Sequence, residues 1–134
     1  MAGEQTLPIQ ECPDVICETH TRIFADGTTT DNTGAWFYCE RDTIVDAAFA
    51  VSIDADSDLT FTLKHAPSGT AVGSATAITN AMGVTTADTT VTGTIDTDNN
   101  LVPAGSWIHI VVAGTADAAA HVCSVQMRIR TRIA

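Results

Sequence analysis

Residues 122–133 read VCSVQMRIRTRI, and apolar and polar side chains alternate along this stretch almost without exception. The apolar set is Cys123, Val125, Met127, Ile129 and Ile133, and the polar set is Ser124, Gln126, Arg128, Arg130 and Arg132. A period of two is that of a β-strand with one face buried. The stretch therefore predicts a half-buried strand whose outer face carries a stripe of three arginines.

Composition limits the partners of the chain. It has 134 residues, a formal net charge of −10 and a single lysine, Lys64. This length suits one domain, and the acidic balance argues against nucleic acid and anionic membranes as partners. Residues 1–6 lack the basic start and apolar run of a signal peptide, and no apolar stretch approaches ~18 residues. We therefore expect synthesis in a cytoplasm and no membrane span.

Threonine and valine are abundant, and short alternating runs are separated by turn-forming residues. About eight strands are predicted, over residues 21–25, 35–40, 43–54, 59–64, 76–79, 89–96, 106–113 and 122–133. In the third of them one face is expected to hold Val45, Ala47, Phe49, Val51 and Ile53. No helical period interrupts the strands. The predicted fold is all-β, an antiparallel β-sandwich with jelly-roll or Greek-key connections over residues 20–134.

Residues 1–19 show no clean period and contain two prolines, so we interpret them as an extended N-terminal arm. Four apolar residues of the arm are expected to dock on a neighbour: Leu7, Ile9, Val15 and Ile16. The alternative is that the segment forms a first edge strand of the same domain.

The arginines of the stripe lie about 7 Å apart along a strand, and like charges so close need carboxylates nearby. The acidic residues of the arm are one source, in this chain or another. An ordinary cross-strand pair, for example with Asp46, is the alternative. Arg128, Arg130 and Arg132 are therefore predicted, with the apolar arm residues, to form an interface with another subunit or another protein.

Other chemistry receives less support from the sequence. Asp54, Asp56 and Asp58 resemble part of a calcium loop, but the EF-hand positions for glycine and glutamate hold Leu59 and His65. We favour a hydrogen-bonded turn and predict no metal and no cofactor.

Cysteines, histidines and aromatic residues give no catalytic signature. Cys39 and Cys123 are expected to be buried on strands. A disulfide between Cys12 and Cys17 is an alternative that the sequence does not decide. The four histidines follow no motif, and no nucleophile signature occurs, so we predict a protein that is not an enzyme. Three aromatic residues could form a sugar-stacking platform, although core packing is favoured: Trp36, Tyr38 and Trp107.

The threonine- and alanine-rich strands, the arm and the sequence LVPAGSWIHIVV over residues 101–112 resemble capsid decoration (cement) proteins of tailed bacteriophages. This resemblance implies a virion protein, made in the host cytoplasm, that binds the outer surface of an assembled capsid and stabilises it. The implied partners are the major capsid protein and further copies of the chain in a homotrimer. The alternative is a tail or surface β-sandwich module that recognises a host glycan.

Overall fold

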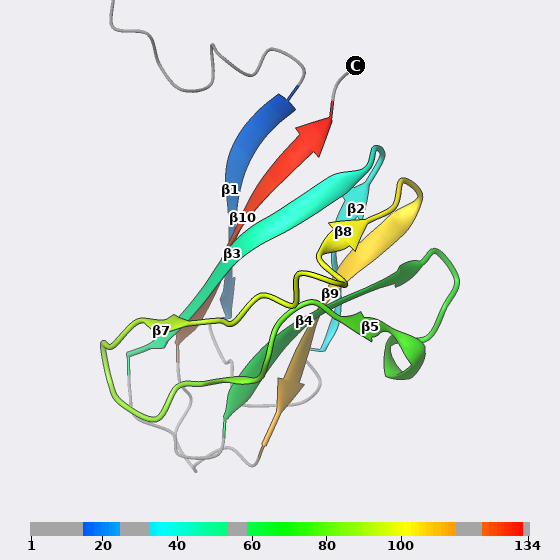
Figure 1. Ribbon diagram of the computed structural model, residues 1–134. Coiled ribbons are helices and arrows are strands. Elements are labelled where there is room, and N and C mark those ends of the chain that lie inside the picture. Colours follow the sequence, from blue (N-terminus) through cyan, green and yellow to red (C-terminus); the bar gives the residue numbers. More distant parts are fainter. Residues whose placement is uncertain (1–14, 25–32, 54–58, 115–121, 133–134) are drawn as a thin grey trace, which may run out of the picture.

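The protein consists of two antiparallel β-sheets of five strands each, packed face to face (Figure 1). This is a computed structural model, and it describes residues 15–24, 33–53, 59–114 and 122–132, without the side chain of Arg132. Sheet A contains β1 (Val15–Phe24), β3 (Thr43–Ser52), β7 (Val91–Thr92), β8 (Leu101–Val102) and β10 (Cys123–Arg132). Sheet B contains β2 (Gly34–Cys39), β4 (Thr60–Pro67), β5 (Thr76–Ala77), β6 (Met82–Gly83) and β9 (Ser106–Ala113). A short 3₁₀ turn, η3 (Val72–Ser74), precedes β5.

The first four strands pair with the later ones in reverse order. β1 pairs with β10 and β2 with β9, while β3 pairs with β7 and β8 and β4 with β5 and β6. β10 also pairs with β3, and β9 with β4, which gives the orders β1-β10-β3-β7 and β2-β9-β4-β5. This nested arrangement, alternating between two sheets, is a jelly roll. The predicted all-β sandwich is therefore confirmed.

The core lies between the sheets and is built chiefly by four of the five long strands, β3, β4, β9 and β10. Its largest fully buried side chains include Phe61, Leu63, Ile108, Ile110, Met127 and Ile129. Shorter segments close the core with Leu59, Ile78, Met82, Val84 and Val102. Removing these side chains from water is the main stabilising term of such a fold.

β10 has the alternation that its sequence predicts. Cys123, Val125, Met127 and Ile129 are at most 1% exposed, and the residues between them face outward. The strand begins one residue later than predicted, at Cys123, and is described to Arg132. Ile133 lies outside the described residues.

In β3 the predicted face is wrong beyond Val45. The buried residues are Thr43 and Val45, followed by Ala48, Ala50 and Ser52, whereas Phe49 and Val51 are half-buried on the opposite face. The cause is a β-bulge: Ile129 pairs with Val45, but Arg128 pairs with Ala47, so Asp46 is an extra residue. One extra residue exchanges the two faces of the strand that follows.

The predicted boundary between arm and sandwich also differs. β1 includes Val15–Thr19 and pairs with β10 over ten residues without a register shift, so these five residues form part of an edge strand. The sequence does not predict the first half of this strand, because the inward face of β1 carries Glu18, His20 and Arg22 and so lacks an apolar period. Residues 1–14 of the predicted arm lie outside the described residues.

The stretch between β4 and β9 contains four strands of only two residues each, which agrees with the short edge strands expected around residues 76–79. Between β6 and β7 the sandwich is tight at Gly93, where a Cβ would lie 2.9 Å from Sδ of Met82. The described part of the chain contains no helix with the length and hydropathy needed to cross a membrane.

Burial predicts which cysteines react with alkylating reagents. Cys17 is exposed and free, whereas Cys39 and Cys123 are each 1% exposed. Burial raises the pKa of the Cys39 thiol, against a smaller opposite effect of its hydrogen bond with Thr43, so the reactive thiolate is suppressed. In a Cys12→Ser variant, iodoacetamide should label only Cys17 in the folded protein. Mass spectrometry before and after unfolding in urea measures this, and labelling of Cys39 without unfolding would contradict the packing.

Candidate functional site

The candidate site is the outer face of sheet A, where the structure places Arg128 and Arg130. Both arginines are exposed on β10. Val15 and Ile16 begin β1, and by register Val15 lies opposite Arg132, the last residue of β10. The remaining predicted residues lie outside the described part of the chain: Leu7, Ile9, Asp54, Asp56 and Asp58.

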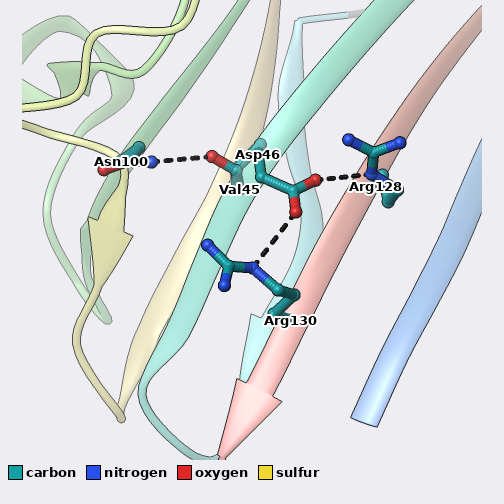
Figure 2. A network of polar contacts seen from close by, with 5 residues as sticks. All are labelled: Val45, Asp46, Asn100, Arg128 and Arg130. Atoms are coloured by element: carbon teal, nitrogen blue, oxygen red, sulfur yellow. Dashed lines mark hydrogen bonds and ion pairs between the residues drawn. The ribbon is translucent and has the colours of Figure 1, made fainter. Parts of the chain in front are cut away.

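One carboxylate links two of the arginines (Figure 2). Asp46 Oδ1 accepts a hydrogen bond from Arg128 Nε at 2.7 Å, and Asp46 Oδ2 forms an ion pair with Arg130 Nε at 3.1 Å. The bulge makes this possible, because it turns Asp46 toward the outer face between the two arginines. The intrachain partner considered from the sequence is therefore present for Arg128 and Arg130.

A hydrogen-bonded segment next to the bulge holds β3 in place. Asn100 Nδ2 donates to the carbonyl oxygen of Val45 at 3.0 Å, and the Val45 amide donates to the carbonyl oxygen of Asn100 at 3.0 Å. Figure 2 shows this contact beside the Asp46 pair. The residue before Asp46 is thus fixed on one side by Asn100 and on the other by β10.

Two guanidinium groups share one carboxylate, so the group carries a surplus positive charge. The side chains of Arg128 and Arg130 remain 55% and 48% exposed, while that of Asp46 is 23% exposed. Both contacts use Nε, so the outer nitrogen atoms of the guanidinium groups keep their donors available. In a chain with a net charge of −10, this face is suited to an external carboxylate.

Apolar side chains surround the charged group. Arg130 pairs with Ile44, which in turn pairs with Leu101, 53% exposed. A hollow of about 390 Å³ is lined by Val15, Asp42, Ile44, Leu101 and Arg130. A second one of about 250 Å³ is lined by Phe49, Ala50, Val51, Thr90, Ser124 and Gln126. The outer face of sheet A therefore combines two exposed arginines that share the carboxylate of Asp46 with apolar hollows, the larger of which also holds Asp42.

Sequence reasoning missed the apolar part of this face. The predicted strand places Phe49 and Val51 on the same face as the buried Val45, and the sequence does not assign Ile44 and Leu101 to the interface. The sequence contains one indication that Phe49 faces outward. Asp46 interrupts an apolar strand, and the residues that flank Phe49 are small alanines. Small residues fit the inner face, and the larger Phe49 is left outside.

The three aromatic residues of the possible sugar platform do not act together. Tyr38 and Trp107 lie opposite each other in sheet B, with ring centroids 5.2 Å apart, and Tyr38 is 42% exposed. Trp36 stands at a register shift in β2 and packs against the core. Only a pair of rings is left on the outer face of sheet B.

Histidines and cysteines of the described residues do not assemble into a metal site. His20 Nε2 lies 2.8 Å from Glu18 Oε2, and His65 Nε2 lies 3.0 Å from the carbonyl oxygen of Asn99. His109 is 8% exposed, and its Nδ1 has no hydrogen-bond partner among the described residues. His109 is therefore a packed residue, as the sequence predicts. That the protein is not an enzyme remains a prediction.

The buried His109 should make stability depend on pH. Desolvation lowers the pKa of its imidazole below the ordinary value of 6.5, so below that pH the unfolded chain binds a proton that the folded chain excludes. The free energy of unfolding should therefore fall as the pH falls from 6.5 toward the folded-state pKa. Urea denaturation at pH 7.5 and 5.5 measures this difference, which should be smaller in His109→Leu. An equal difference in both proteins would contradict this role of His109.

Asp46 should stabilise the fold modestly. Asp46→Asn leaves Arg128 and Arg130 close together without a carboxylate, and the expected loss is about 1 kcal/mol or less, because the arginines are exposed and screened. Urea denaturation at low and high salt measures it, and the loss should shrink at high salt. Asp98→Asn is the control, because it removes the same charge from an exposed turn. Equal effects of the two variants would contradict the pairing.

Comparison with known proteins shows similarity at the level of the fold. No family model and no curated protein match the chain. Among solved structures, a chain of the "Cyanophage Pam1 capsid asymmetric unit" matches with a TM-score of 0.55 and 21% identity, over 90% of this chain and 86% of that chain. A chain of "Bacillus endospore appendages form a novel family of disulfide-linked pili" matches with a TM-score of 0.47 and 16% identity, over 90% of this chain and 89% of that chain. The first of these similarities shows that this jelly roll is similar to a fold found in a phage capsid asymmetric unit.

Proposed function

We propose that this protein is a structural component of a phage virion that binds the outer surface of an assembled capsid and stabilises it. The observation that carries the proposal is the fold shared with a chain of a cyanophage capsid asymmetric unit. Comparable shares of the two chains are aligned, so the matched chain is itself a small protein of similar length. An accessory subunit of a shell fits that size better than a large shell-forming protein does.

The outer face of sheet A is the proposed capsid-binding face. The exposed guanidinium groups of Arg128 and Arg130, which share one carboxylate, fit acidic side chains of the major capsid protein, and the apolar hollows can take protruding apolar side chains. A capsid offers many identical sites, so contacts that are modest for one subunit become strong when linked subunits bind together. We include in the proposal the homotrimer that the resemblance implies. We also include the contact of the arm predicted over residues 1–19 with a neighbouring subunit or the capsid, which rests on its apolar residues without a period.

The second candidate function is glycan recognition by the tilted ring pair Tyr38 and Trp107. This pair lies on the outer face of sheet B, away from the arginines. The two functions therefore require different faces of the molecule. Substitutions on one face should leave the other function unchanged.

Charge reversal tests the capsid-binding face. In an Arg128→Glu/Arg130→Glu variant, co-sedimentation with purified capsids of the parent phage should fall at least tenfold, because three carboxylates would then face the acidic partner surface. Lys64→Glu, on the outer face of sheet B, is the control for a single charge reversal on the other face and should bind as the unmodified protein does. Circular dichroism checks that each variant is folded. Undiminished sedimentation of the double variant would overturn this choice of face.

Failure of the unmodified protein to bind these capsids would overturn the proposed function itself.

A glycan array, probed with the unmodified protein and with Trp107→Ala, tests the second candidate function. Light scattering measures the oligomer: a mass near three times the 14.0 kDa of one chain, or a multiple of that mass, supports the trimer, and a monomer or a dimer contradicts it.

A further inference from the structure

β1 presents the longest regular sheet edge of the described structure. It has ten residues, stands last in sheet A, and pairs with β10 along its whole length without a shift. The other edge strands differ: β2 has six residues and a register shift, and β5, β6, β7 and β8 have two residues each. No strand of the described residues pairs with the other side of β1, which therefore carries a long row of main-chain N–H and C=O groups that can accept another strand.

The side chains of β1 restrict which strand can be added. On its inward face Glu18 and Arg22 carry opposite charges on either side of His20. Both side chains have partners within the chain, because Glu18 contacts His20 at 2.8 Å and the Arg22 guanidinium lies 4.8 Å from the ring centre of Phe24. Inward-facing charges ordinarily keep other strands away from an edge. A partner must offer the complementary charges at the same spacing.

We propose that β1 pairs antiparallel with β1 of a second copy of this chain, in a register centred on His20. Residues opposite each other in antiparallel strands face the same side of a sheet. Outward residues of β1 must therefore meet outward residues, and inward residues must meet inward ones. The centre can consequently be any one residue near the middle, which leaves Thr19, His20 and Thr21.

Charge selects among these centres. Centring on His20 sets Glu18 opposite Arg22 of the other copy, and the two-fold symmetry repeats this pair at the other end. Centring on Thr19 places Arg22 opposite Ile16, and centring on Thr21 places it opposite His20. In the His20 register the apolar ends also match, because Ile16 meets Phe24. The charges that repel an unrelated strand thus specify a second copy.

Pairing through β1 joins the A sheets of two copies into one continuous sheet, and the outer faces of the copies lie on the same side. Arg128 and Arg130 of both copies then belong to one surface. The contact has two-fold symmetry, so it is separate from the contact that would form a trimer, and it does not depend on the proposed function.

Charge exchange tests the pairing. Glu18→Arg alone and Arg22→Glu alone each place like charges opposite each other twice, so the dissociation constant of the β1 contact should rise at least tenfold in sedimentation velocity. The double variant Glu18→Arg/Arg22→Glu restores both opposite pairs and should restore association. Lys64→Glu is the control for a change of charge elsewhere. Single variants that associate normally, or a double variant that stays dissociated, would overturn the proposal.

Disulfide trapping tests the register. Opposed residues of antiparallel strands have Cα atoms about 4.5–5.5 Å apart, within the range of a disulfide. In a Cys12→Ser/Cys17→Ser background, His20→Cys should form a covalent dimer under mild oxidation, since residue 20 meets itself. Thr19→Cys and Thr21→Cys should not. A dimer from either of these, or none from His20→Cys, would overturn the register. Capsid binding is measured separately, so failure of one proposal leaves the other to be judged by its own assay.

Discussion

The position of β10 between β1 and β3 is the constraint on which the rest of the structure depends. Its inner side chains fill the core of the sandwich, and its outer side chains supply the arginines of the candidate site. Its pairing with β1 holds that strand in a regular register along its full length. A half-buried central strand can serve both roles because successive side chains point to opposite faces.

The bulge in β3 connects this constraint to the surface chemistry. Without the extra residue Asp46, the strand would keep one phase, and Phe49 and Val51 would point into the core. With it, alanines occupy the inner positions, the larger side chains face outward, and a carboxylate reaches both arginines. One residue thus determines both the charge and the apolar character of the outer face.

The sequence predicted the fold class and the inward face of β10 because these follow from alternation between clearly different side chains. It could not predict the faces of β3, since a bulge leaves the composition of the strand unchanged and only shifts its phase. It assigned Val15–Thr19 to an arm because an edge strand with charged inward residues lacks an apolar period. For the candidate site, alternation identified Arg128 and Arg130, but their apolar neighbours come from β3 and β8, which only the pairing of distant segments brings together.

The nested pairing of the jelly roll also bears on how the chain folds during synthesis. The strands β1 and β3 lie on either side of β10, which is the last strand of the described residues. Sheet A therefore cannot close until the ribosome has made β10, and until then facing edges of β1 and β3 stay unpaired. Contacts between residues so far apart in sequence form slowly, and open strand edges favour aggregation. Folding of sheet A is thus expected to follow completion of β10, with the inward charges of β1 limiting unwanted pairing in the interval.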